Sequence, residues 1–109
     1  MYDIQHLEAF CLVADERSFT KAAARMGYSQ SAVSKIIIDL ERECGTVLFK
    51  RSRSGVQITA EGATLLSAAQ EVIAAQRSFE ARVAEIHNLD SGLIRIGTIS
   101  SIATHWLPK

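Results

Sequence analysis

The sequence is poor in the residues that build loops, large aromatic cores and reactive sites. Only 6% of its 109 residues are aromatic, and it contains 6 glycines, 1 proline and 2 cysteines. Low glycine and proline contents argue against a disordered or loop-rich chain, and few aromatic residues favour a small helical core over a large β-sandwich. Because 48% of the residues are hydrophobic, the chain can form one ordinary domain, or a small domain with an appendage.

Catalytic and metal-binding patterns are also missing from the sequence. Cys11 and Cys44 stand far apart without CxxC spacing, so both are expected to be reduced core thiols. His6, His87 and His105 are scattered, and none belongs to an HExxH motif. We therefore predict that the chain is not an enzyme and that it holds no metal or cofactor of its own.

Long apolar runs do not occur either. The first ten residues, MYDIQHLEAF, include charged residues and lack the apolar stretch of a signal peptide. A membrane helix needs about 20 consecutive apolar residues. These absences predict no signal peptide, no contact with a membrane, and a cytoplasmic location.

The chain as a whole has no net charge, but one segment of it does. The formal net charge is zero, whereas the segment from Arg17 to Arg53 has a basic excess of five. A neutral average therefore hides a basic segment, which is typical of surfaces that bind nucleic acid. The basic residues of this segment are Arg17, Lys21, Arg25, Lys35, Arg42, Lys50, Arg51 and Arg53, and the acidic ones are Asp39, Glu41 and Glu43.

Three helices are predicted in the first half of the chain. Apolar residues with helical spacing predict a helix over residues 4–15. A second, short helix lies in RSFTKAAARMGY, with Ser18 as its N-cap and Gly27 as its stop, and a third covers residues 29–45. The short connection between the second and third helices has helix-turn-helix spacing. The predicted buried face of the first helix comprises Leu7, Phe10, Cys11 and Ala14.

The second half predicts a hairpin and a long helix. VLFKRSRSGVQIT alternates around the turn-rich tetrad SRSG, which predicts two strands, with Leu48 and Phe49 as packing residues. A long helix follows over residues 60–88, capped by Thr59, and LIRIGTI is a predicted strand. The predicted fold is mostly α: a winged helix-turn-helix domain over 1–59, a linker and dimerisation helix over 60–89, and the beginning of a truncated effector-binding domain over 90–109.

One face of the third helix is predicted to point outward. On a helical wheel with about 100° per residue, Val33 lies on the core side and Ile38 on the opposite side. Ile38 is either a lone exposed apolar residue, which is common, or it contacts a thymine methyl or a sugar edge in a DNA major groove. Polar residues near the start of a recognition helix reach base edges, and basic residues contact phosphates. The predicted DNA-contacting residues of this helix are Gln30, Ser31, Ser34, Lys35, Ile38 and Arg42.

A 3.5-residue apolar repeat runs along the long helix. Spacings of four and three residues over three heptads are typical of helix pairing. A helix of about 29 residues is about 43 Å long at 1.5 Å per residue, which is longer than so small a domain can cover. Pairing between two chains is therefore favoured over packing on the chain's own core, and a symmetric dimer presents two recognition helices to an inverted repeat. The predicted seam comprises Leu65, Ala69, Val72, Gln76, Phe79, Val83 and Ile86.

The ordered set of these motifs resembles the N-terminal domain of LysR-type transcriptional regulators. SFTKAA, SQSAVS, LFKR and TAEG occur in family-like order over residues 1–62. The resemblance implies a sequence-specific regulator that binds an inverted-repeat operator in double-stranded DNA as a homodimer. The recognition helix then lies in the major groove and the wing follows the minor groove or the backbone. The resemblance also implies phosphate contacts from Ser18 and Thr20, and wing contacts from Arg51 and Arg53.

The resemblance has further implications and some departures. It implies a small-molecule effector for a C-terminal domain that this chain lacks, and it allows a tetramer of the full-length protein. Ser31 stands where the family often has proline, Ile36 and Ile38 where glutamine and a basic residue are frequent, and Asp39 where a basic residue is also frequent. The operator sequence therefore cannot be transferred from relatives. A competing hypothesis from another class is a winged-helix protein–protein interaction module, with the long helix as its partner surface.

Overall fold

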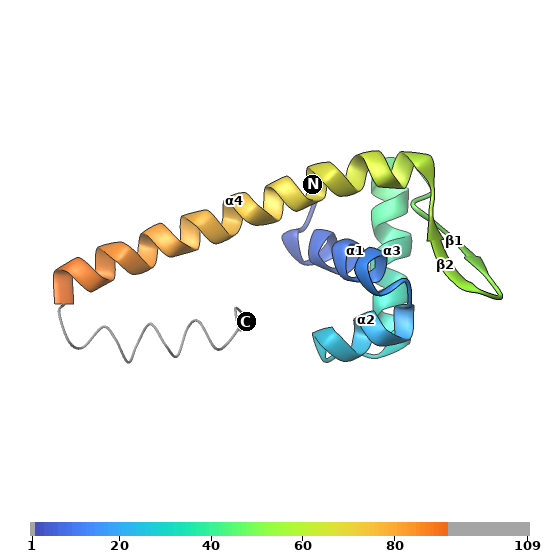
Figure 1. Ribbon diagram of the computed structural model, residues 1–109, viewed down its shortest axis with the longest axis horizontal. Coiled ribbons are helices and arrows are strands. Elements are labelled where there is room, and N and C mark those ends of the chain that lie inside the picture. The colour runs from blue at the N-terminus through green and yellow to red at the C-terminus, as the bar shows by residue number, and fades with distance from the viewer. Residues whose placement is uncertain (1, 92–109) are drawn as a thin grey trace. The chain divides into compact units, whose positions relative to one another are not determined.

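The computed structural model describes residues 2–91, which form four helices and one hairpin (Figure 1). The elements are α1 (Ile4–Glu16), α2 (Phe19–Met26), α3 (Gln30–Cys44), β1 (Phe49–Ser52), β2 (Gly55–Ile58) and α4 (Ala60–Ser91). β1 and β2 pair antiparallel, with Phe49 opposite Ile58 and Ser52 opposite Gly55. The mostly helical winged helix-turn-helix predicted from the sequence is thus confirmed.

Two compact units make up the chain, Met1–Ala74 and Ala75–Lys109. The boundary between them falls inside α4, whereas the sequence placed the end of the first domain at residue 59. Residues 92–109 lie outside the described residues, and with them the predicted strand LIRIGTI and most of the domain expected over 90–109. Within the described part of the chain, no helix combines the length and apolar character needed to cross a bilayer.

Local side-chain chemistry sets the ends of the helices, as predicted. The hydroxyls of Ser18 and Ser29 cap α2 and α3, each accepting a hydrogen bond from the backbone N–H three residues later at 3.1 Å. Thr59 Oγ1 accepts from the third residue of α4 in the same way, at 2.9 Å. Gly27 and Gly45 follow α2 and α3 in the left-handed region that ends helices. Each such N-cap contributes about 1 kcal/mol.

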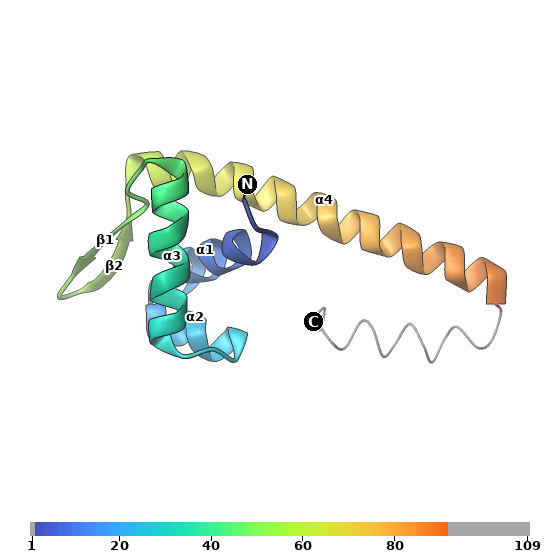
Figure 2. The same ribbon diagram turned by 180° about the vertical axis from the view of Figure 1, so that it is seen from behind.

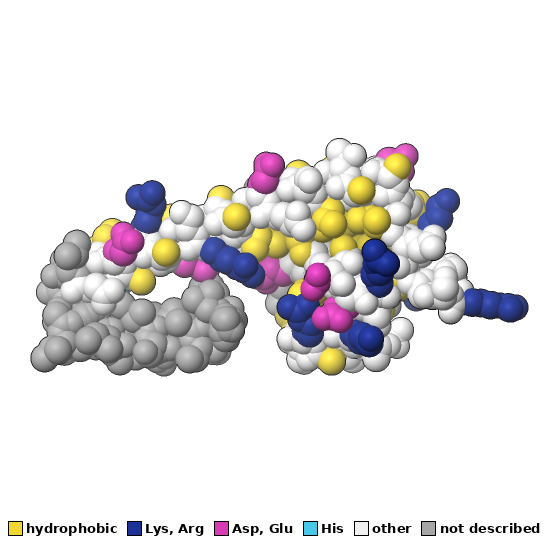
Figure 3. Space-filling model, in the orientation of Figure 1, with side chains coloured by type: hydrophobic (Ala, Val, Ile, Leu, Met, Phe, Trp, Pro, Cys, Tyr) yellow, Lys and Arg dark blue, Asp and Glu magenta, His cyan; other side chains and the backbone are white. Residues whose placement is uncertain are grey.

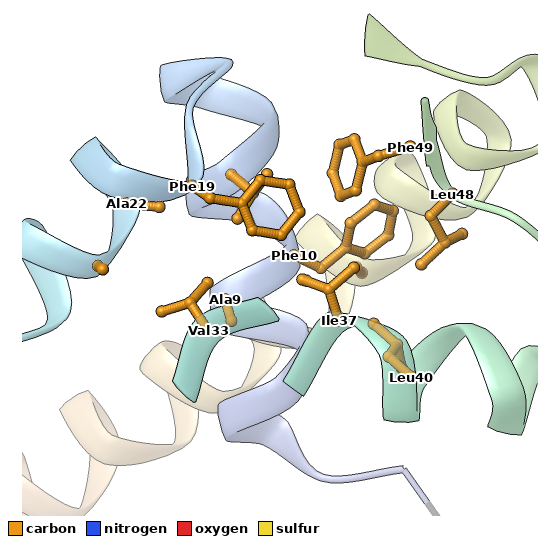
Figure 4. Packing of buried hydrophobic residues seen from close by; sticks show 12 residues of the cluster. Ala9, Phe10, Phe19, Ala22, Val33, Ile37, Leu40, Leu48 and Phe49 are labelled. Atoms are coloured by element: carbon orange, nitrogen blue, oxygen red, sulfur yellow. The ribbon is translucent and has the colours of Figure 1, made fainter. Parts of the chain in front are cut away.

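The core of the first unit forms where α1, α2, α3 and the hairpin meet (Figure 4). Phe49 of β1 packs edge-to-face against Phe10 of α1 and Phe19 of α2, with ring centroids 5.5 and 6.2 Å apart. Such aromatic pairs contribute beyond the area that they bury. The residues that α3 adds to this core are Val33, Ile37 and Leu40.

The predicted inner face of α1 was partly wrong. Phe10 is buried, but Ala9 and Val13 are the other fully buried residues of the helix. Leu7, Cys11 and Ala14, which the spacing also assigned to the buried face, are half-buried and pack at the margin of the core. The reason is that α1 contacts both α2 and α3, so its buried stripe turns toward the groove between them.

Both cysteines and His6 are partly buried, whereas His87 is exposed. Cys11 and Cys44 are not in a disulfide, and both are half-buried against the core. Burial raises the pKa of the Cys44 thiol, with smaller contributions from nearby carboxylates, so it stays protonated near neutral pH. His6 is half-buried and its Nδ1 has no hydrogen-bond partner. His105 lies outside the described residues.

The first turns of α4 pack closely on the loop before β1. A Cβ atom added to Gly62 would stand 2.4 Å from the carbonyl oxygen of Leu48, so only glycine permits this approach. Further along, Ala69 is 4% exposed and belongs to the core of its own chain, with Leu65 packed against it. The assignment of Ala69 to a seam between chains is therefore corrected, because this side chain has almost no surface to offer a partner.

Candidate nucleic-acid interface

The turn between α2 and α3 has the geometry of a helix-turn-helix. Gly27 adopts φ 75°, and the N–H of Tyr28 donates to the carbonyl oxygen of Ala23 at 3.0 Å. α2 and α3 pack against each other and against α1. Figure 2 shows α3 on the near side, with α1 and α2 behind it. One side of α3 therefore belongs to the core and the other faces outward.

The outward face of α3 is exposed, as the helical wheel predicts. Ile38 is 49% exposed, although its neighbour Ile37 is buried. Ser31, Lys35 and Arg42 share this exposed face. The structure therefore brings a large apolar side chain and two cations together on one solvent-facing strip.

At its start, α3 presents short polar side chains. Gln30 is the first residue of the helix and is exposed. The hydroxyl of Ser31 lies 3.3 Å from that of Ser29, the capping residue. This contact ties Ser31 to the cap, and Gln30 therefore offers the more adaptable hydrogen-bonding group of the two.

Arg51 links the wing, which is the β1–β2 hairpin, to the helix-turn-helix. Its Nη2 donates to the hydroxyl of Ser34 on α3 at 3.1 Å, and its guanidinium carbon lies 4.1 Å from the centre of the Phe19 ring on α2. A planar guanidinium can make both contacts at once. Arg51, which the resemblance assigns to DNA contact, is thus also a residue that holds β1 against α2 and α3.

Arg53 occupies the turn between the two strands and is exposed. Ser52 shapes this turn by donating from its hydroxyl to the carbonyl oxygen of Gly55 at 3.2 Å. Figure 3 shows a Lys or Arg side chain projecting at the far end of the hairpin. The tip of the wing therefore carries positive charge into solvent.

Residues at the start of α2 behave differently from one another. Ser18 is half-buried and caps the helix with its hydroxyl, whereas Thr20 is exposed.

At the other end of α2, Arg25 pairs with Asp15 and Glu16 of α1, both at 2.9 Å. Hydrogen bonds to Glu16, and then to Asp15, raise the pKa of Arg25. Part of the basic excess of the segment is therefore already matched by carboxylates.

Sequence reasoning missed the role of Glu41. Its Oε2 accepts hydrogen bonds from the backbone N–H groups of Leu48 at 2.8 Å and Phe49 at 3.3 Å. This one carboxylate therefore joins the second half of α3 to the beginning of the wing. The available signal was its wheel position toward the core side, since a part-buried carboxylate needs donors.

The apolar repeat of α4 is exposed in its later part. In the second unit, Phe79 is 68% exposed, and Val83 and Ile86 are also large exposed hydrophobic residues, whereas Gln76 is half-buried. In the first unit, Val72 is exposed as well. Large apolar side chains that repeat on a helix and face solvent are typical of surfaces that bind a partner.

The sequence of this region matches a known protein family. The chain matches the model of the family described as bacterial regulatory helix-turn-helix protein, lysR family, over residues 4–63. It is 40% identical over 101 residues to the HTH-type transcriptional regulator PgrR of Escherichia coli (strain K12), covering 93% of this chain and 34% of that protein. It is 35% identical over 103 residues to the HTH-type transcriptional activator BauR of Pseudomonas aeruginosa, covering 94% and 34%. The chain thus spans about a third of the length of these curated relatives.

Solved structures with a similar fold agree with this family match. A crystal structure of BenM_DBD in a complex with catB site 1 DNA has a TM-score of 0.75 at 30% identity, covering 78% of this chain and 96% of that one. A CbnR_DBD–DNA complex has a TM-score of 0.67 at 29% identity, covering 77% and 99%. Both similar structures contain DNA.

Proposed function

Because this chain belongs to the LysR family of bacterial regulatory helix-turn-helix proteins, we propose that it is the DNA-binding part of a transcriptional regulator that reads double-stranded DNA with α3. The observation that carries the proposal is the solvent-facing side of α3, where Ile38 and two cations lie opposite a fully buried side. Elements that dock in a major groove need this combination of a packed side and an open polar side.

In this proposal, the beginning of α3 reads base edges. The amide of Gln30 pairs with adenine through two hydrogen bonds, and the hydroxyl of Ser31 donates to or accepts from a neighbouring base. Ile38 lies where an apolar side chain contacts a thymine methyl or a sugar. Ser34 has a second role, because it accepts the hydrogen bond from Arg51.

Phosphate contacts hold the domain on the duplex. Lys35 and Arg42 on α3, Thr20 at the start of α2, and Arg53 at the tip of the wing are exposed and face the backbone on either side of the groove. Ser18 is mainly a capping residue, and its contribution is to orient the N-terminus of α2 toward a phosphate. These contacts fix position and supply the salt-dependent part of the affinity.

Two copies of the chain pair through the exposed repeat of α4. The later positions of the predicted seam, notably Phe79, Val83 and Ile86, are the surface offered to the partner. A two-fold dimer presents two α3 helices to an inverted repeat whose half-sites are about 34 Å apart, or a multiple of that distance. A regulator of this kind acts where bacterial DNA is, in the cytoplasm. The small-molecule effector that the resemblance implies for a C-terminal domain stays a prediction.

Titration of the purified chain with two DNA duplexes tests the proposal. One duplex contains inverted repeats from the region beside the protein's own gene, and the other has a random sequence of the same length. We expect tight binding of the first alone at physiological salt. Gln30→Ala should weaken that binding about 5- to 150-fold, since a good bidentate base contact is worth about 1–3 kcal/mol. Gln70→Ala, at an exposed position of α4, is the matched control.

Equal affinity for the two duplexes, or no binding of either, would contradict the proposal. In the second case the competing hypothesis of a protein–protein interaction module would become the better explanation of the exposed apolar surface. Equal losses from the Gln30 and Gln70 variants would leave α3 without a role in base reading, and would contradict its assignment as the recognition helix.

A further inference from the structure

An acidic residue stands between the two cations on the outward face of α3. Asp39 Oδ2 accepts from Lys35 Nζ at 3.2 Å, and its Oδ1 accepts from Arg42 Nη1 at 3.3 Å. Each carboxylate oxygen therefore accepts a hydrogen bond from one cation, as the spacings of four and three residues on a helix allow. The strip that faces the proposed DNA thus carries one net positive charge where its cations alone would give two.

These ion pairs contribute little to the fold. The side chains of Lys35 and Arg42 are 76% and 75% exposed, and that of Asp39 is 32% exposed. Exposed pairs of this kind are screened by water and salt and have small effects on stability. Removing the charge of Asp39 should leave the domain folded, and should change mainly the electrostatic field that a DNA backbone meets.

A carboxylate in this position opposes contact with phosphate in two ways. It repels the negatively charged backbone, and it occupies N–H donors of Lys35 and Arg42 that would otherwise reach phosphate oxygens. Attraction between cations and phosphates supplies essentially all of the affinity for non-specific DNA. In operator binding, base contacts near Gln30 fix the register of α3, so that register sets which phosphates Lys35 and Arg42 can reach. On random DNA the domain can settle where these two cations meet the most phosphates. Asp39 should therefore weaken non-specific binding by a larger factor than operator binding.

We propose that Asp39 is a specificity-determining residue, which suppresses binding to non-operator DNA by engaging Lys35 and Arg42. This inference rests on the proposed function, because it presumes that the outward face of α3 meets DNA. It extends that function, because it assigns a role to an acidic side chain that makes no favourable contact with the DNA backbone. That role is to raise the ratio of operator affinity to random-DNA affinity.

Salt-dependent titrations of Asp39→Asn test the inference. The full chain is titrated with the operator duplex and with the random duplex at several salt concentrations. The asparagine variant should bind random DNA roughly three- to tenfold more tightly at low salt. Its plot of log affinity against log salt should steepen by about 0.9 for each additional phosphate that Lys35 or Arg42 reaches, up to about 1.8. The operator-to-random affinity ratio should fall by a similar factor.

Glu43→Gln is the matched control. It removes one negative charge from the same helix at an exposed position. Lys35 and Arg42 form their ion pairs with Asp39 and not with Glu43, so this variant reports the effect of net charge alone. A second control repeats Asp39→Asn in a variant with Lys35→Ala and Arg42→Ala. In that background the change at residue 39 should no longer steepen the salt dependence, because the cations through which it acts are absent.

Three results would overturn the inference. The asparagine variant could match Glu43→Gln in both affinity and salt dependence, or it could tighten operator and random binding equally. It could also lose operator affinity alone, which would show instead that Asp39 accepts a hydrogen bond from a cytosine amino group. Wild-type protein that binds neither duplex would overturn the proposed function and this inference together. Normal wild-type operator binding with any of the three results above overturns only the inference.

Discussion

The carboxylate of Glu41 should be a main support of the wing. Its Oε2 accepts from two backbone N–H groups, of Leu48 at 2.8 Å and of Phe49 at 3.3 Å. Hydrogen bonds to charged groups contribute about 1.5–3 kcal/mol each, and the longer one lies beyond the usual N–H···O distance of about 3.0 Å. Glu41→Ala leaves both donors without this acceptor, so we expect a loss of about 2–4 kcal/mol. Glu41→Gln keeps a neutral acceptor and should lose about half as much.

Equilibrium unfolding in urea, followed by far-ultraviolet circular dichroism, measures these losses. With a slope of about 2 kcal/mol per M, which is usual for a small protein, Glu41→Ala should lower the midpoint by about 1–2 M. All variants are compared at one protein concentration, because pairing of chains stabilises the folded state. Glu43→Ala makes the same chemical change at an exposed position of α3 and should stay within about 0.5 kcal/mol of wild type. Equal midpoints for the Glu41 and Glu43 alanine variants would refute the reasoning.

Two further predictions concern the partner surface and the position of the wing. Phe79→Asp with Val83→Asp should convert the dimer to a monomer in light scattering, because two charges would enter an apolar interface. Ser78→Asp should not, and a dimer that survives the double change would contradict pairing through α4. Arg51→Lys keeps the charge but loses the planar group that lies over Phe19 and bonds to α3. It should weaken operator binding without changing the salt dependence, and wild-type affinity would show that Arg51 does not position the wing.

Local chemistry explains why much of the fold could be predicted from the sequence. Ser18, Ser29 and Thr59 cap helices through bonds that span three residues, and Gly27 and Gly45 end helices through their own backbone conformations. These features depend on neighbours in the chain, so their sequence signals are reliable. The direction of Ile38 also follows from periodicity alone once the helix is known.

Features that depend on contacts between different elements could not be predicted from the sequence. The seven-residue repeat of α4 does not distinguish Ala69, which packs in the core of its own chain, from Phe79, which stays exposed. The hydrogen bonds between Glu41 and Leu48 and between Arg51 and Ser34 join different elements of the fold, across 7 and 17 residues of the chain. The pairs made by Asp39 are different, since their spacing on one helix could have been read from the sequence.

The three consecutive isoleucines of α3 provide the most direct test of the central claim, that the outward face of this helix lies against DNA. Ile37 is buried and Ile38 is 49% exposed, so the first is an internal control for the second. In a complex of isoleucine-methyl-labelled protein with operator DNA, intermolecular nuclear Overhauser effects should connect Ile38 methyl groups to DNA protons and should be absent for Ile37. A specific complex in which Ile38 methyl groups show no contact with DNA would contradict the account.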